Sequence, residues 1–208
     1  MPTNYDSIAR IYDLTSRMVF GKAIVKAQEC MLAYIRPESN MLIVGGGTGW
    51  ILESLSELYP QGLSIDYVEV SAQMIALSQK RNYKGNKVNF IHQPIEEFTT
   101  SKQYDIIITP FIFDNFKQDK IEVVFGKLDR QLQNEGLWLY ADFIYDKSQS
   151  KLWQKLLLKI MYLFFRITCG IETQDLISME SYFASSYHNE FEASHYFKFI
   201  KSVVYRKL

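Results

Sequence analysis

A glycine-rich turn follows a short apolar run in the segment MLIVGGGTGW (Met41–Trp50). Glycines between a strand and a helix let the backbone approach a ligand closely and leave helix N–H groups free for polar ligand atoms. Trp50 and Ile51 stand where a phosphate-binding loop needs lysine followed by serine or threonine, which excludes that loop. The spacing satisfies GxGxG but not GxGxxG, so a dinucleotide with its pyrophosphate is disfavoured.

A glutamate at the end of the next apolar run narrows the choice of ligand. Glu69, in YVEVSAQM, lies twenty residues after Gly49. A carboxylate at this place can accept hydrogen bonds from both hydroxyls of a ribose. The order strand, GGGTG, helix, strand and glutamate therefore indicates an adenosine-bearing ligand without a diphosphate.

The elements that position these residues alternate between strand and helix patterns, which is typical of a parallel sheet covered by helices. The expected strands are Met41–Val44, Leu63–Val70, Lys87–His92, Tyr104–Thr109, Gly136–Phe143, Phe191–Phe197 and Phe199–Tyr205. The expected helices lie within Ser7–Tyr34, Gly49–Leu58, a segment capped by Ser71, Asp119–Gln133, Leu152–Ile167 and Leu176–Ser185. Because the last two strands are joined by a very short connection, they must be antiparallel.

Composition limits the class of protein. A chain of 208 residues that is 48% hydrophobic suits one packed domain, 1–208. Its formal net charge of zero provides no field that would attract nucleic acid. Cys30 and Cys169 form no metal-binding spacing with each other or with the three histidines, so no metal site is predicted. No signal peptide is visible at the N-terminus, and we expect a cytoplasmic protein.

Five segments in order resemble the class I S-adenosylmethionine-dependent methyltransferases. They are MLIVGGGTG, YVEVS, FIHQPIEEF, YDIIITPF and EGLWLYADF. The opening YDSIARIYDLTS also resembles the methyltransferases of quinone biosynthesis and phospholipid amine methylation, in which a helix with two Tyr-Asp pairs folds over the cofactor. The resemblance implies a three-layer, Rossmann-like, doubly wound α/β sheet, mostly parallel, with seven strands and an antiparallel C-terminal strand. It also implies lid helices over 1–40 and a helical cap or insert over 147–187.

The resemblance further implies S-adenosyl-L-methionine as the cofactor and a set of residues that bind it, while it assigns no catalytic residue. The implied cofactor-binding residues are Tyr12, Gly45, Gly46, Gly47, Gly49, Glu69, Val70, Gln93, Pro94, Ile95 and Thr109.

Two positions depart from the family's pattern. Ile43 replaces the acid that precedes the glycines, and Gln93-Pro94 replaces the usual Gly-Asp that serves the adenine. Each lost charged hydrogen bond weakens binding by about 1.5–3 kcal/mol. Three functions remain open, in decreasing order of preference. They are a methyltransferase enzyme, a non-catalytic protein that binds S-adenosylmethionine or S-adenosylhomocysteine, and an NAD-dependent oxidoreductase.

The segment KLWQKLLLKIMYLFFRITCG bears on the substrate. Lys151, Lys155 and Lys159 recur every four residues and share one helical face, while Trp153 and several aliphatic residues cover the other. Such a helix can cap a substrate pocket, pack on the core, join a dimer or lie on a membrane surface. We expect a small or lipid-like acceptor, with O-, N- or C-methylation left open, possible contact with a membrane surface, and no nucleic acid.

Overall fold

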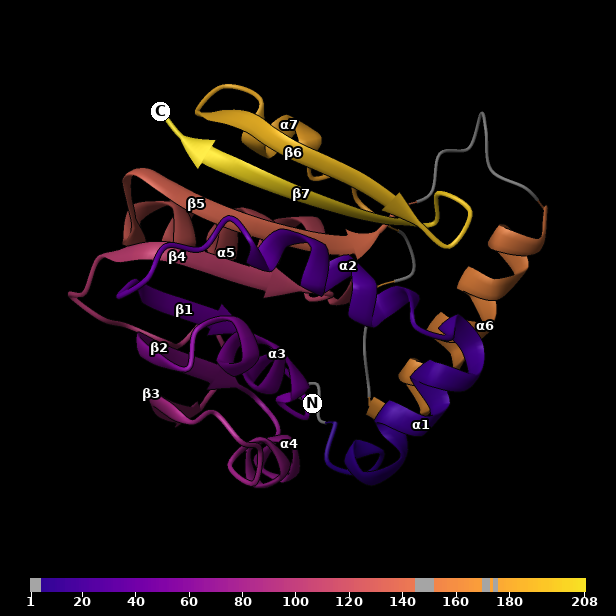
Figure 1. Ribbon diagram of the computed structural model, residues 1–208. Helices are drawn as coiled ribbons and strands as arrows, with labels where there is room; N and C mark the ends of the chain where they lie inside the picture. The colour runs from indigo at the N-terminus through magenta and orange to yellow at the C-terminus, as the bar shows by residue number, and fades with distance from the viewer. Residues whose placement is uncertain (1–4, 145–151, 170–172, 174–175) are drawn as a thin grey trace.

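A computed structural model describes residues 5–144, 152–169, 173 and 176–208 of the protein. It contains a single seven-stranded sheet among the described residues (Figure 1). The strands are β1 (Asn40–Val44), β2 (Gln61–Glu69), β3 (Gly85–His92), β4 (Tyr104–Pro110), β5 (Leu132–Phe143), β6 (Tyr187–His195) and β7 (Ile200–Lys207). The helices are α1 (Ala9–Phe20), α2 (Ala23–Leu32), α3 (Trp50–Leu58), α4 (Ala72–Ser78), α5 (Gln118–Gln131), α6 (Leu152–Cys169), α7 (Glu180–Phe183) and a 3-10 turn, η1 (Phe113–Asn115).

The strand order is β3-β2-β1-β4-β5-β7-β6. Strands β1 to β5 pair in parallel with their neighbours, whereas β7 is antiparallel to both β5 and β6. The predicted fold class is therefore confirmed, with β7 as the antiparallel strand. The chain moves outward from β1 to β3 and then returns to β4 on the other side of β1. Open α/β sheets bind ligands at such a reversal, beyond the carboxyl ends of the strands.

Helices cover both faces of the sheet because the buried strands are apolar on both sides. Met41 and Ile43 of β1 pack in one core cluster with residues of α2 and α3, and Leu42 and Val44 pack in a second with residues of α5 and α7. Helices α1 and α6 cover neither face of the sheet. They stand next to each other beyond the carboxyl ends of the parallel strands (Figure 1), where Tyr12 packs on Phe165.

Local signals account for two helix starts that border the ligand-binding edge. Gly49, with φ of 77°, ends the glycine turn and starts α3 in a conformation that favours glycine. The hydroxyl of Ser71 accepts a hydrogen bond from the Met74 N–H at 3.1 Å, which confirms the predicted cap of α4.

The C-terminal third differs from the sequence prediction in two places. The expected helix over Leu176–Ser185 is wrong in extent, since helix forms only at α7. Phe183 stacks on Tyr205 of β7 with ring centroids 4.0 Å apart, so aromatic packing rather than helical periodicity places this segment. The expected strand over Phe191–Phe197 is also misplaced: β6 runs from Tyr187 to His195. Residues 196–198 have positive φ values of 47°, 56° and 65° and form the turn to β7.

Candidate functional site

A cavity of about 410 Å³ lies at the carboxyl ends of β1, β2 and β4. Its walls come from α1, the turn between β1 and α3, the end of β2, residues 93–96, the turn after β4 and α6. Segments from both halves of the chain therefore enclose one space. Its volume falls within the range of small-molecule and cofactor sites.

The glycine turn brings bare backbone against this cavity. A Cβ on Gly45 would lie 2.3 Å from Ile112 Cγ2, and one on Gly46 would lie 2.4 Å from the Tyr67 ring. Neither position has room for a side chain. Gly47 has open space around its missing Cβ but a φ of 62°, which L residues rarely adopt. The turn can thus present peptide groups to a ligand at close range.

Glu69 is the buried carboxylate that fixes the glycine turn. Its Oε2 accepts from the Gly47 N–H at 3.1 Å and its Oε1 from the Ser71 N–H at 2.9 Å. The Tyr67 hydroxyl donates to the Gly47 carbonyl at 2.9 Å. Burial raises the pKa of Glu69, and the backbone hydrogen bonds oppose that rise. Each carboxylate oxygen keeps a further lone pair for a ligand hydroxyl.

Most of the residues predicted to bind the cofactor line this cavity. They are Tyr12, Gly45, Gly46, Gly47, Glu69, Val70, Gln93, Pro94 and Ile95. Gly49 and Thr109 are not among the lining residues. A Cβ on Gly49 would press on Ser78 at 2.4 Å, so this glycine allows close packing of α4. The Thr109 hydroxyl accepts from Trp138 Nε1 at 2.9 Å inside the core, and the next residue, Pro110, reaches the cavity.

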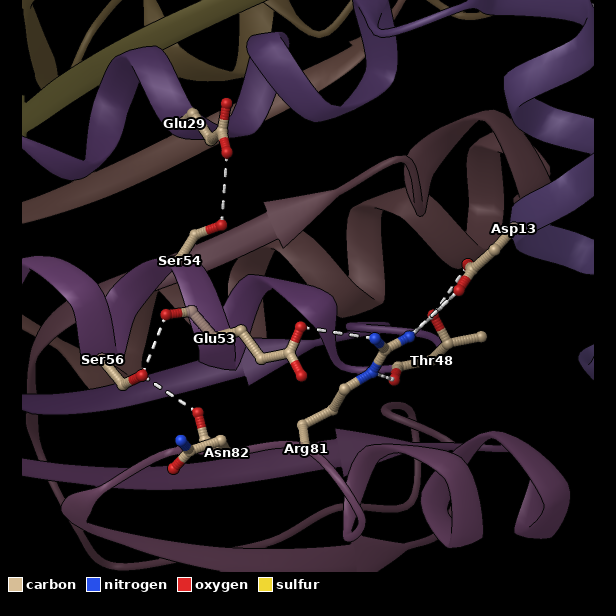
Figure 2. A network of polar contacts seen from close by, with 8 residues as sticks. All are labelled: Asp13, Glu29, Thr48, Glu53, Ser54, Ser56, Arg81 and Asn82. Carbon is tan, nitrogen blue, oxygen red and sulfur yellow. Dashed lines mark hydrogen bonds and ion pairs between the residues drawn. The ribbon is translucent and has the colours of Figure 1, made fainter.

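An ionic network joins α1 to the glycine turn (Figure 2). The Thr48 hydroxyl donates to Asp13, and Arg81 Nη2 donates to the same carboxylate at 3.0 Å. Arg81 Nε also donates to the Thr48 carbonyl at 2.9 Å, and Nη1 lies 3.4 Å from Glu53 Oε2. We call these four residues the α1 latch. Sequence reasoning named Tyr12 and missed its neighbour Asp13, although the repeated Tyr-Asp pair was a signal for both.

The first Tyr-Asp pair makes an equivalent attachment to α4. Asp6 Oδ1 accepts from the Ser71 hydroxyl at 2.5 Å and from the Gln73 N–H at 3.0 Å. An acceptor at the start of a helix satisfies its free N–H groups. The two aspartates thus fasten the N-terminal segment at both sides of the cavity, while Tyr5 and Tyr12 form part of its wall.

A chain of polar contacts continues from Tyr5 to the turn after β4. The Tyr5 hydroxyl donates to Asn115 Oδ1, and Asn115 Nδ2 donates to Asp114 Oδ1 at 2.7 Å. Asp114 lines the cavity. Burial and then the charge of Asp142 raise its pKa well above the ordinary carboxyl value. Asp114 is therefore a protonatable group in the wall of the cavity.

Asp142 lies buried behind Asp114 at the end of β5. Its Oδ2 accepts from the Phe113 N–H at 3.1 Å and its Oδ1 from the Phe143 N–H at 2.8 Å. Burial raises the pKa of Asp142 to about 7, and these backbone hydrogen bonds limit the rise. The sequence offered a signal in the ADF that ends β5, but it could not show that Asp142 lies beside Asp114.

The structure also locates the two departures from the family pattern. Ile43 is fully buried in the core beneath the turn, and Pro94 lines the cavity. The carboxylates nearest the glycine turn among the lining residues are Glu69 and Asp13, and Asp13 is shared with Arg81. Both carboxylates are already engaged within the described part of the chain, Glu69 by two backbone N–H groups and Asp13 by Arg81.

Comparison with known proteins agrees with this geometry. Residues 41–136 match the model of a methyltransferase domain family. The fold matches the complex of DhpI with SAH with a TM-score of 0.70 at 18% identity, covering 98% of this chain and 93% of that one. Residues 41–136 are thus similar to a methyltransferase domain. A second solved structure with the same fold is magnesium protoporphyrin IX methyltransferase from Synechocystis PCC 6803 with bound SAH. Its TM-score is 0.65 at 14% identity, and the match covers 89% of this chain and 82% of that one.

A curated relative is the malonyl-[acyl-carrier protein] O-methyltransferase of Priestia megaterium. It is 27% identical over 139 residues, which are 67% of this chain and 49% of the relative. The chain thus spans about half the length of the curated relatives it matches. This similarity covers the part of the chain that matches the methyltransferase domain model, and it does not identify the acceptor.

Proposed function

We propose that this protein is an enzyme that transfers the methyl group of S-adenosylmethionine to a small or lipophilic acceptor. The observation that carries the proposal is Glu69, a buried carboxylate hydrogen-bonded to the Gly47 N–H and facing a cavity walled by bare glycine backbone. This arrangement offers acceptors to a ribose and leaves no room for an extra side chain. A cavity of about 410 Å³ accommodates a nucleoside with a short chain.

The residues of the cavity have distinct tasks in this proposal. Glu69 would hold the ribose hydroxyls, Gly47 the amino-acid portion, and Gln93 with Ile95 the adenine. S-adenosylmethionine supplies an electrophilic methyl group on a sulfonium, so the protein's contribution is alignment and exclusion of water. The acceptor atom forms the new bond to carbon while the carbon–sulfur electron pair stays on sulfur. Where the acceptor bears a proton, that proton would leave to solvent, and Asp114, whose raised pKa favours its protonated form, would orient the acceptor by donating a hydrogen bond.

Isothermal titration calorimetry tests the cofactor. We expect S-adenosylmethionine and S-adenosylhomocysteine to bind, and Glu69→Ala to weaken both by about tenfold or more, because a charged hydrogen-bond acceptor is lost. Glu57→Ala, which removes an exposed glutamate on α3, is the control and should leave affinity unchanged. Binding of NAD in place of both compounds would contradict the proposal and favour an oxidoreductase.

A second function, cofactor binding without catalysis, is favoured by one observation. Ile43 is buried where the family pattern has an acid, so the cofactor's ammonium lacks that partner. A radiolabelled methyl group separates the two functions. Label transferred to a molecule from a lipid or aqueous cell extract supports the enzyme, whereas tight binding without transfer to either extract supports the binding protein.

The acceptor class follows from the walls beyond the cofactor's place. Phe111, Phe116, Phe143, Met161 and Phe164 contribute apolar surface, which favours a lipophilic molecule. Nucleic acid is not proposed as the acceptor, because the whole chain has no net positive charge to attract a phosphate backbone. We further propose that residues 1–40 act as a lid, that 147–187 act as a cap within one domain, and that the enzyme works in the cytoplasm; residues 1–4, 147–151, 170–172 and 174–175 of these ranges lie outside the described residues.

A further inference from the structure

Helices α1 and α6 together expose an unusual amount of apolar surface. They carry eleven of the fifteen large hydrophobic side chains that are exposed among the described residues. These are Ile11, Leu14, Met18, Val19, Leu152, Trp153, Leu156, Ile160, Leu163, Phe164 and Ile167. We call this set the α1–α6 face. Contiguous exposed apolar surface of this kind marks a binding surface rather than ordinary solvent-exposed helix.

The two helices form one continuous surface. They stand side by side beyond the carboxyl ends of the strands (Figure 1). The Ser7 hydroxyl donates to the Thr168 carbonyl at 2.8 Å, and Tyr5 packs on Phe165 with ring centroids 6.0 Å apart. The apolar side chains that point outward therefore share a wall whose inner side lines the cavity.

The charges on this face are all positive. Lys155, Lys159 and Arg166 are exposed on α6, which contains no aspartate or glutamate, and Arg17 is exposed on α1. Asp13, the one acid of α1, is bound by Arg81 and Thr48. Lys151, the first of the three regularly spaced lysines, lies outside the described residues. Although the whole chain has no net charge, this face is cationic.

We propose that the α1–α6 face docks on an anionic lipid surface. Apolar side chains of an amphipathic helix enter the boundary between headgroups and acyl chains while lysines contact anionic headgroups. A second copy of this chain is a poorer occupant, because a symmetric contact would bring like charges together. An acidic protein would match the lysines, but it would have to cover an apolar area that dominates the face.

If the proposed function is correct, the position of the α1–α6 face allows an acceptor to reach the cavity from the lipid surface. Val19, Ile160 and Phe164 are exposed and also line the cavity. A lipophilic acceptor can therefore pass from the lipid surface into the cavity along apolar side chains. Among the described residues no helix has the length and apolarity to cross a bilayer.

Co-sedimentation with lipid vesicles tests this proposal. We expect the full chain to bind phosphatidylcholine vesicles that contain phosphatidylglycerol, and to bind pure phosphatidylcholine weakly. Lys155→Gln with Lys159→Gln should weaken binding to the anionic vesicles about thirtyfold, and salt should weaken the wild type as well. Leu156→Gln with Leu163→Gln should also release the protein, since both side chains are exposed and neither lines the cavity.

Matched controls use similar residues elsewhere on the surface. Lys80→Gln with Lys84→Gln removes two exposed lysines near α4, and Val123→Gln removes an exposed apolar side chain of α5. These variants should bind vesicles like the wild type. Circular dichroism verifies that every variant is folded, and cofactor titration by calorimetry separates the two proposals. Vesicle binding without cofactor binding would refute only the methyltransferase, and the reverse result would refute only the docking.

Two other outcomes overturn the lipid proposal. If the protein is a dimer that Leu156→Gln with Leu163→Gln makes monomeric, and vesicles do not bind, the face is a contact between copies. If an acyl carrier protein binds the wild type and not the lysine variant, and vesicles again do not bind, the face serves an acidic protein partner.

Discussion

At the scale of single residues, the site contains carboxylates that differ in their hydrogen-bonding and ionic partners. Glu69 is bound by backbone N–H groups, Asp13 by Arg81, and Asp142 by two N–H groups at the end of β5. Asp114 faces the cavity with Asn115 as its amide donor. Asp13 thus attaches α1 to the glycine turn, while Glu69 and Asp114 line the cavity as the carboxylates to which ligand contacts are proposed.

The pair Asp114 and Asp142 makes stability depend on pH. Both pKa values are raised in the folded protein, that of Asp142 to about 7, from an unfolded value near 3.9. A carboxyl whose pKa is raised by folding stabilises the fold while protonated, and this contribution is lost as pH rises through the folded pKa. We expect the free energy of unfolding to fall between about pH 4 and about pH 7, by roughly 1.4 kcal/mol for each unit of pKa shift.

Asp114→Asn tests the origin of this dependence. The variant removes the titration of a carboxyl whose pKa is raised by burial and then by the charge of Asp142, so its urea unfolding at several pH values should show a flatter profile than that of the wild type. Glu57→Gln, an exposed change, should keep the wild-type profile. If Asp114→Asn retained the full loss of stability with rising pH, titration of Asp114 would not contribute to that loss.

The sequence predicted residues whose positions follow from one strand–helix–strand unit, and it missed residues that are brought together only by tertiary contacts. The glycine turn and Glu69 follow from spacing along one strand–helix–strand unit, and both reach the cavity. Asp114 and Asp142 come from different strands, so nothing in either local pattern reveals that they meet. Thr109 illustrates the opposite case: its place at the end of β4 was foreseen, but the alternation of the strand turns its side chain into the core.

At the scale of elements, α1 depends on few attachments to the rest of the molecule. Asp13 and Arg81 are partly exposed, with side chains 34% and 26% accessible, so their ion pair contributes on the order of 1 kcal/mol. An α1 latch of this strength is compatible with the lid proposed for residues 1–40. An opening helix suits a site that must exchange cofactor and product.

Arg81→Ala should loosen this helix without touching the cavity. We expect faster amide hydrogen exchange across α1 and about fivefold weaker S-adenosylmethionine binding, because about 1 kcal/mol of closure is lost. Glu29→Ala, which breaks the exposed contact to Ser54 drawn in Figure 2, is the control and should alter neither measurement. Unchanged exchange in α1 of Arg81→Ala would mean that packing of Tyr12 on Phe165, rather than the α1 latch, holds the helix.

At the scale of the whole molecule, elements distant in sequence share one cavity. The β1–α3 turn, the turn after β4 and helices α1 and α6 all line it, whereas β6 at the far edge of the sheet does not. The sequence predicted the sheet because hydrophobic periodicity is local. It left the place of α6 open among four uses, since the same amphipathic pattern suits each of them.

Cofactor binding should therefore slow amide hydrogen exchange in all of these segments at once. A ligand present at a hundred times its dissociation constant stabilises the folded state by about 2.7 kcal/mol. With S-adenosylmethionine in that excess, hydrogen exchange should slow in the glycine turn, in residues 110–116 and in α1, while β6 should change little. NAD at the same concentration should have no effect. Protection confined to the glycine turn would contradict a closed cavity, because a lid that does not contact the cofactor gains nothing from its binding.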